Sequence, residues 1–361
     1  MLRKLKNKIK QYKWGRILAY CKNKNFYKAK IREHLTVLLE AEPEKKWINW
    51  CYKDFLDFYK RHGCLDFDDL QYTMQCDYFG TQMFRKSEFV RAESFATPYR
   101  KIWRDRINDK KYWSIFDNKK EFNLAFSEYL HRPWMAANNA TTLAELQSFC
   151  TECDNKVFAK DPWGCGGHGV QFYDTSDISQ FDTLYKLCMV QELVLEGNVN
   201  QCEELFSFSN SSVNTLRIIT IVDKNETPHV AAAAFRMGMG GVKIDNFSSG
   251  GIASQVDVET GLLYTGAIAK NGRTYFEHPY TKKQIIGYRI PDWESYKKFA
   301  LDLAMKFPQM HYIGWDIVKD TNGHFVCIEG NREAGADVME SNSLHGYLKL
   351  YDDIYNARIS D

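Results

Sequence analysis

Short runs of β-branched and aromatic residues, separated by Gly, Pro and polar residues, dominate the chain from residue 157 onward, and this pattern predicts strands. The predicted strands cover residues 157–160, 170–173, 188–194, 216–222 and 230–235. Apolar positions at helical spacing predict helices over 143–150 and 296–307, and a helix over 112–136 that leads into an extended stretch around Pro133. Strands and helices segregated in this way indicate the α+β class.

The segment from residue 31 to 108 is predicted to be helical. Trp47, Trp50, Cys51 and Phe55 recur at i, i+3, i+4 and i+8, so this stripe predicts the buried face of a helix. Aromatic stripes of this kind usually belong to the core, and the segment contains no catalytic constellation.

Residues 314–331 predict a hairpin, because two apolar runs flank Asn322-Gly323, a dipeptide that favours a two-residue type I′ turn. In that register Asp316 lies opposite Glu329, and Asn331 shares their face of the ladder. Facing carboxylates repel each other unless a cation lies between them, and oxygens of these three residue types are accepted by Mg²⁺. The pattern therefore predicts metal ligands; the alternative is an ordinary hairpin whose acids point into water.

A glycine-rich loop, Gly164-Cys165-Gly166-Gly167-His168-Gly169, satisfies the spacing G-x-G-x-x-G. A dinucleotide fingerprint needs a helix after the loop, whereas residues 170–173 predict a strand, and no Gly-Lys-Ser/Thr closes a Walker A loop. Protein kinases carry their lysine after the flap together with a His-Arg-Asp loop. Here Lys160 precedes the loop, and His-Arg-Asp does not occur. The pattern favours a hairpin flap whose backbone N–H groups close over phosphates, with a simple surface hairpin as the alternative.

Composition bears on the compartment. No apolar run approaches the length of a membrane span, and Lys and Asn interrupt the N-terminal segment before a signal-peptide core can form. The ten cysteines have no regular spacing, and the close pair Cys150 and Cys153 lacks the second pair that a zinc site requires. We therefore expect free thiols and a cytoplasmic protein.

Charge is distributed unevenly along the chain. Residues 1–32 hold twelve of the 48 Lys and Arg and none of the 46 Asp and Glu, so the remainder is acidic overall. Leu2, Leu5, Ile9 and Tyr12 recur at helical spacing among lysines, which predicts a basic amphipathic helix. Such a helix can contact an anionic membrane surface or pack on the acidic remainder. Nucleic-acid binding is disfavoured because no recognised nucleic-acid module follows.

These features together resemble one superfamily. Lys160 before a glycine flap, then Val190-Gln191-Glu192-Leu193-Val194, then Asp316 and Glu329-x-Asn331 resemble the ATP-grasp superfamily over roughly residues 110–345. More narrowly, the chain resembles the sugar-transfer-associated ATP-grasp family found with surface-polysaccharide genes. The stretches that carry this narrower resemblance are Phe116-Asp117-Asn118-Lys119, Ser212-Val213-Asn214-Thr215-Leu216-Arg217, Asp245-Asn246-Phe247-Ser248-Ser249-Gly250-Gly251, His278-Pro279, Ile290-Pro291-Asp292-Trp293 and Gly314-Trp315-Asp316.

The resemblance implies an ATP-grasp fold, in which two α+β subdomains clasp ATP, preceded by a mainly helical N-terminal region. The expected domains are a basic tail at 1–32, a helical region at 33–110 that replaces the usual first α/β domain, and an ATP-grasp domain at 111–361.

The resemblance also implies roles for the matched residues, with ATP and Mg²⁺ as cofactors. The implied nucleotide-binding residues are Lys119 and Lys160 at the phosphates, Gly164, Gly166, Gly167 and Gly169 in the flap, Gln191, Glu192, Leu193 and Val194 as a hinge at the adenine, and Glu196 at the ribose. The implied Mg²⁺ ligands are Asp316, Glu329 and Asn331. Arg217 would steady the γ-phosphate, and the other implied catalytic residues are Lys160, Arg236 and Asn246. The acceptor would contact Arg236, Ser249, Gly250, Gly251, His278 and Arg332.

The activity implied by this resemblance is an ATP- and Mg-dependent carboxylate–amine ligase in surface polysaccharide (capsule) biosynthesis. A substrate carboxylate would attack the γ-phosphate to give an acyl phosphate, and an amine would then displace phosphate to form an amide. The expected partners are an amino acid or amine and a glycan precursor that carries a sugar acid or aminosugar, in the cytoplasm or at the inner face of the membrane. The alternatives are a phosphotransferase acting on a hydroxyl and a non-catalytic nucleotide-binding scaffold at the membrane.

Overall fold

The computed structural model describes residues 21–39, 42–62, 99–164, 169–210, 212–240, 250–269, 273–335, 337–340 and 346–358. The chain divides into two compact units, one of residues 1–103, 268–274 and 335–349, the other of residues 104–267, 275–334 and 350–361. Within the described ranges, no helix combines the length and the apolar character needed to cross a bilayer. The predicted basic helix from Leu2 to Tyr12 lies outside the described residues.

The first unit contains helices α2 (Lys24–Leu39) and α3 (Lys45–His62), which contact each other, and the short helix α14 (Asp337–Glu340). Among the side chains of α3 that the structure describes, Ile48, Cys51 and Tyr52 are buried, whereas Trp47 and Trp50 are 50% and 45% exposed. The side chain of Phe55 is not among those described. The predicted stripe is therefore wrong for both tryptophans. Ile48, Cys51 and Tyr52 also follow i, i+3, i+4 spacing, so the periodicity fits two adjacent helix faces and packing selects one of them.

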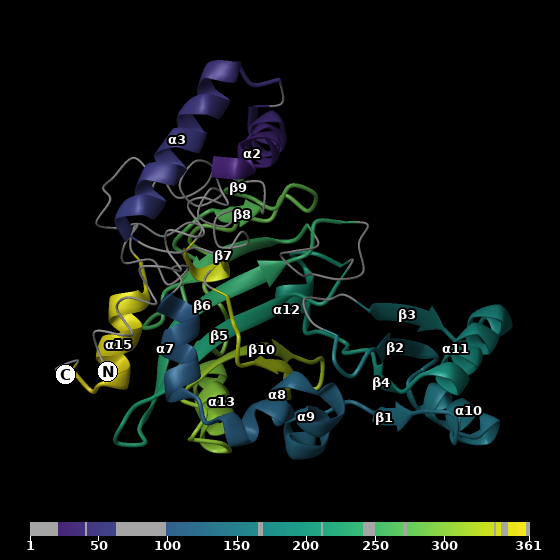
Figure 1. Cartoon of the computed structure of the whole chain (residues 1–361). Coiled ribbons are helices and arrows are strands. Elements are labelled where there is room, and N and C mark those ends of the chain that lie inside the picture. The colour runs from purple at the N-terminus through teal and green to yellow at the C-terminus, as the bar shows by residue number, and fades with distance from the viewer. Residues whose placement is uncertain are drawn as a thin grey trace. The chain divides into compact units, whose positions relative to one another are not determined.

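The second unit holds two antiparallel sheets and most of the strands (Figure 1). The smaller sheet has the order β1-β4-β2-β3 and consists of β1 (Trp134–Ala137), β2 (Lys156–Lys160), β3 (Val170–Asp174) and β4 (Leu193–Gly197). Helices α10 (Leu143–Glu152) and α11 (Ile178–Val190) share an apolar core with this sheet. On β2 the core takes Val157 and Ala159, which leaves Phe158 and Lys160 on the opposite face.

Two predicted elements around this sheet are wrong in part. Residues 188–190 end helix α11 instead of beginning a strand, because Asp177 caps the helix at Ser179 N and buried positions Phe181, Leu184 and Cys188 continue its apolar face. The predicted helix over 112–136 is broken into η2 (Lys110–Tyr112), α8 (Trp113–Asp117), α9 (Lys119–Ala125) and η3 (Ser127–Tyr129). Asn118 has an extended backbone and caps α9, its Oδ1 accepting from the N–H groups of Lys120 and Glu121.

The larger sheet has the order β11-β10-β5-β6-β7 within the second unit. Its main strands are β5 (Thr215–Val222), β6 (Pro228–Met237), β7 (Ile252–Val256), β10 (Tyr312–Lys319) and β11 (Phe325–Asn331). The chain also forms the short strands β8 (Ala267–Ala269) and β9 (Thr274–Tyr275). Helix α13 (Trp293–Met305) packs on β5, β6 and β10, and the short helix α12 (Glu203–Phe206) lies between β4 and β5 in the chain. Helices α7 (Tyr99–Ile107) and α15 (Leu348–Tyr355) complete the described helices. The predicted α+β class is confirmed.

Aromatic packing fixes helices α8 and α9 against the larger sheet. The buried Trp315 ring of β10 lies 6.0 Å from Phe116 of α8 and 5.5 Å from Phe126, centroid to centroid. Phe122 of α9 stacks on Phe126 at 4.5 Å, and a Cβ at Gly330 of β11 would clash with both Trp315 and Phe122. The start of α9 is thereby held beside the edge strand β11.

The hairpin of β10 and β11 pairs Asp316 with Glu329 as predicted, but its turn differs from the predicted one. Asp320 N donates to His324 O, and Gly323 adopts φ +86°, so the loop has three residues instead of two. A β-bulge between Asp316 and Ile317 then shifts the register and returns Asp316 to its place opposite Glu329. The predicted turn is wrong, and the predicted Asp316–Glu329 pairing is confirmed.

Candidate functional site

A cavity of about 430 Å³ lies between the start of α9, the beginning of the glycine loop, β4 and the edge strand β11. Lys119 reaches it from α9, Lys160 and Glu196 from the smaller sheet, and Glu329 and Asn331 from the larger sheet. Its lining residues are Phe116, Asp117, Lys119, Phe122, Asn123, Lys160, Trp163, Gly164, Glu196, Ile328, Glu329, Gly330, Asn331, Arg332 and Glu333. Seven of the residues that the sequence predicts as functional therefore meet here: Lys119, Lys160, Gly164, Glu196, Glu329, Asn331 and Arg332.

Both predicted phosphate-binding lysines enter this cavity. Lys119 begins α9; its Nζ donates to the carbonyl of Gly164 at the start of the glycine loop, and its backbone N donates to Pro162 O at 2.8 Å. Burial lowers the pKa of Lys119, an effect that the Glu329 carboxylate opposes. Lys160 ends β2, and its Nζ donates to Glu196 Oε2 at 2.6 Å. The two cations are thus held at the mouth of the glycine loop.

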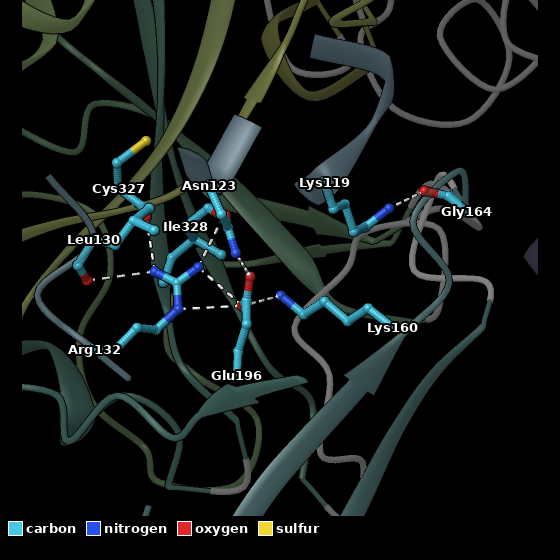
Figure 2. Close-up of polar contacts among 9 residues, drawn as sticks. All are labelled: Lys119, Asn123, Leu130, Arg132, Lys160, Gly164, Glu196, Cys327 and Ile328. Atoms are coloured by element: carbon cyan, nitrogen blue, oxygen red, sulfur yellow. Dashed lines mark hydrogen bonds and ion pairs between the residues drawn. The ribbon is translucent and has the colours of Figure 1, made fainter. Parts of the chain in front are cut away.

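Glu196 is the centre of a buried polar network (Figure 2). Its Oε2 accepts from Nε and Nη2 of Arg132 at 3.1 and 2.9 Å as well as from Lys160, and its Oε1 accepts from Asn123 Nδ2 at 2.9 Å. Burial by itself would raise the pKa of Glu196, but the charges of Arg132 and Lys160 hold it well below its ordinary value. The carboxylate is therefore ionised and fully engaged, and its implied contact with the ribose stays a prediction that this arrangement does not favour.

A second buried network joins β5, β6 and β10. Arg217 Nε and Nη2 donate to Asp316 Oδ1 and Oδ2 at 2.6 and 2.9 Å, and Arg236 Nη1 donates to Asp316 Oδ2 at 2.8 Å. Burial opposes ionisation of Asp316, yet the two guanidiniums lower its pKa to about 2. Strand register explains the contact between Arg217 and Asp316, since these two residues are direct partners across β5 and β10. The Asp316 carboxylate thus links strands β5, β6 and β10 through two guanidiniums.

The predicted metal ligands are placed together in part. Glu329 and Asn331 line the cavity, and Asp316 faces Glu329 across the ladder. However, Asn331 Oδ1 accepts from Glu333 N at 2.7 Å, and both oxygens of Asp316 are taken by arginines. The half-buried carboxylate of Glu329 is suited to Mg²⁺, whereas Asn331 Oδ1 would have to share its hydrogen bond from Glu333 N and Asp316 would have to exchange an arginine contact for the metal.

Residues 99–352 match the family described as sugar-transfer associated ATP-grasp, which is more than half of the chain. The chain belongs to this family. ATP-grasp proteins are typically ATP-dependent ligases, and their fold generally uses ATP and Mg²⁺. A comparison with curated proteins found no match.

Three solved structures illustrate what the chain is similar to. The ADP complex of purK, an N5-carboxyaminoimidazole ribonucleotide synthetase, is 13% identical with a TM-score of 0.41, over 62% of this chain and 46% of that one. The ATP-grasp ligase PsnB, complexed with a phosphomimetic variant of its minimal precursor, Mg and ADP, is 13% identical with a TM-score of 0.42, over 68% and 60%. D-alanyl-alanine synthetase A from Vibrio cholerae O1 biovar eltor str. N16961 is 13% identical with a TM-score of 0.41, over 66% and 64%. The chain spans less than two thirds of the length of each of these three.

In this ATP-grasp protein several other predicted residues lie away from the cavity. His278 is buried and its ring Nε2 lies 2.8 Å from Gly238 O, while Gly250 and Gly251 do not line the cavity. Arg332 does line the cavity, but its guanidinium donates twice to Asp117, at 2.6 and 2.9 Å, and stacks on Trp113 at 4.2 Å. Gly166, Gly167, Asn246 and Ser249 lie outside the described residues, and Gly169, at the far end of the loop, has φ +79°. Their roles stay predictions.

The predicted adenine hinge overlaps the start of strand β4, which pairs with β1 on one side and β2 on the other. Leu193 and Val194 pair with β1, and Val194 also pairs with Lys160 of β2, so little of their backbone is left for a ligand. Gln191 and Glu192 are exposed, and Glu192 accepts from Lys120 Nζ at 2.8 Å. The hinge assignment stays a prediction for these first two residues in particular.

A second cavity of about 430 Å³ adjoins the exit of β4. The rings of Phe158 and Phe172, which meet edge to face at 5.2 Å, supply aromatic surface. Asn198, Asn200 and Gln201 supply amide side chains. Phe158 lies two residues before Lys160 on the same face of β2, so the two cavities follow one another along that face. A planar polar group fits such a lining.

Sequence reasoning missed Arg132 and Asn123, both buried and both bound to Glu196. Arg132 stands in an extended Arg-Pro-Trp stretch, and Asn123 is a polar residue on the apolar side of a short helix. A charged or amide side chain at a position otherwise suited to the core is the signal that could have marked them.

Proposed function

We propose that the chain is an ATP- and Mg-dependent carboxylate–amine ligase acting on a glycan precursor. The observation that carries this proposal is the convergence of Lys119, Lys160, Glu329 and Asn331 on one cavity beside the glycine loop. Two ammonium groups oppose the charge of a triphosphate, and the two oxygen donors suit Mg²⁺. When bound, the metal would supply further neutralisation of phosphate charge.

The base of ATP is proposed to lie in the second cavity, which replaces the hinge implied at residues 191–194, and its phosphates in the first. Phe158 and Phe172 offer ring edges and faces to a heterocycle, and residues 198–201 follow β4 where its pairing with β2 ends. This arrangement places the phosphates next to Lys160 and Gly164.

The chain's own residues would position the reaction instead of forming covalent bonds with the substrate. Lys119 and Lys160 would bind the phosphates, and the guanidiniums of Arg217 and Arg236 would hold the γ-phosphate and the acceptor carboxylate. Attack of that carboxylate oxygen on the γ-phosphorus breaks the bond to ADP and yields an acyl phosphate. An amine then displaces inorganic phosphate and forms an amide, losing a proton to solvent.

A product assay tests the reaction class. The full chain, MgATP, candidate sugar acids and candidate amines are incubated together, and the mixture is analysed by mass spectrometry. We expect ADP, inorganic phosphate and an amide, formed only when acid and amine are both present. ADP with a phosphoester would indicate a hydroxyl phosphotransferase, and nucleotide binding without ADP formation would indicate a scaffold; either result contradicts the ligase.

The proposed setting is surface-polysaccharide biosynthesis at the cytoplasmic face of the membrane. It is supported by the sugar-transfer association of the family and by the basic composition of residues 1–32. The proposed partners are an amine or amino acid and a sugar-acid or aminosugar precursor.

Deleting residues 1–30 should abolish sedimentation with anionic liposomes at low salt, because these residues carry the concentrated positive charge. The measurement is the pelleted fraction of full-length and truncated protein with vesicles containing phosphatidylserine, alongside neutral vesicles. MgADP affinity of the truncated protein should equal that of the full chain. Continued sedimentation of the truncated protein would refute the membrane contact.

A further inference from the structure

Arg132 connects the two sheets of the second unit (Figure 2). Its side chain is only 2% exposed, and it donates from Nε and Nη2 to Glu196 of β4. On its other side, Nη1 donates to Cys327 O at 2.8 Å and Nη2 lies 3.3 Å from Ile328 O, both on β11. One rigid guanidinium thus holds a strand of the smaller sheet and the edge strand of the larger one.

The β-bulge in the β10–β11 hairpin explains why two successive carbonyls can meet one guanidinium. Ile317 pairs with Cys327 and Asp316 pairs with Glu329, so Ile328 is the extra residue. Carbonyls of a regular strand alternate between the two edges, whereas a bulge leaves neighbouring groups free to point the same way. The residue that follows, Glu329, is one of the predicted metal ligands.

Charge gives the network a second property. Arg132 and Lys160 each carry one positive charge and Glu196 one negative charge, so the buried group has a formal charge of +1. Because Arg132 shares the carboxylate, Lys160 is only partly neutralised and can still attract an anion in the cavity it lines. With Arg132 removed, Lys160 and Glu196 would neutralise each other.

We propose that Arg132 is a positioning residue for Lys160: it shares the charge of Glu196, so that the Lys160 ammonium stays available to nucleotide phosphates, and it fixes β11 beside that ammonium. This inference rests on the proposed use of ATP. Arg132 itself need not contact ATP, and the function of the bulge at Ile328 is to present two successive carbonyls to Arg132.

The test is a double-mutant cycle on nucleotide affinity, measured by isothermal titration calorimetry with MgADP and the full chain. Arg132→Gln should weaken MgADP binding by about tenfold in the wild-type background and by less than about twofold in the Lys160→Ala background. Equal losses in both backgrounds would overturn the inference, because Arg132 would then act independently of Lys160. If the wild-type chain binds no MgADP, the proposed function itself fails.

A charge-matched variant covers the case in which Arg132→Gln is destabilised. The double variant Arg132→Gln/Glu196→Gln leaves no uncompensated buried carboxylate and restores a formal charge of +1 through Lys160 alone. We expect it to melt cooperatively and to bind MgADP at least about threefold more tightly than Arg132→Gln alone, because the Lys160 charge is again available. A folded double variant that binds MgADP no more tightly than Arg132→Gln alone would overturn the charge argument.

Discussion

Replacing Lys160 with alanine should lower kcat for ATP-dependent product formation by about 10²- to 10³-fold, the usual loss for one preorganised group that stabilises developing charge. Lys160 lies in the cavity beside the glycine loop, and its ion-pair partner among the described residues is Glu196. Since negative charge on the transferred group matters more in the transition state than in the bound substrate, the affinity for ATP should fall by a smaller factor than kcat. The measurement is steady-state ADP release together with MgADP titration.

Lys186→Ala is the matched control for Lys160→Ala. Lys186 is an exposed lysine on α11, the helix that covers the other face of the same sheet. It should leave both kcat and MgADP affinity unchanged while removing the same side chain and charge. An unaltered kcat in Lys160→Ala would remove Lys160 from the proposed machinery.

Replacing Asp316 with alanine should destabilise the second unit by about 3–5 kcal/mol, the usual result of removing one partner from a buried ion pair. Asp316 is 6% exposed, and both of its oxygens accept from buried guanidiniums of Arg217 and Arg236. The substitution deprives two buried cations of this counter-charge in the middle of the larger sheet. Urea unfolding followed by tryptophan fluorescence measures the loss of stability, since Trp315 directly precedes Asp316 on β10.

Asp320→Ala provides the comparison on the same hairpin. Asp320 is also buried, but its carboxylate accepts from the backbone N–H groups of Asn322 and His324 and approaches the exposed His324 ring. We expect its loss to cost about 1–2 kcal/mol, the range for hydrogen bonds without a buried counter-charge. Equal destabilisation by both substitutions would show that the arginine pairing contributes nothing beyond ordinary hydrogen bonding.

The sequence determined those features that depend on neighbours along the chain. Runs of β-branched and aromatic residues placed β2, β3, β5, β6, β10 and β11. The order of Lys160, the glycine loop and Glu329-x-Asn331 indicated the superfamily, and further short stretches indicated the family that residues 99–352 match. The pairing of Asp316 with Glu329 followed from turn and period, although the turn is one residue longer than predicted and the bulge corrects the difference. Local patterns carry such information because pleat and turn geometry act over a few residues.

Only the tertiary structure decided which charged side chains meet. Arg132 and Glu196 are 64 residues apart, and Arg217 and Asp316 are 99 apart, so their contacts depend on sheet order and on packing between layers. The same is true of the face that α3 buries and of the break at Asn118, where capping and aromatic packing outweigh helical periodicity. A sequence shows which residues can be charged or buried. Only the folded chain shows which charges are paired, and this matters because a buried charge is stable only when a partner of opposite charge compensates it.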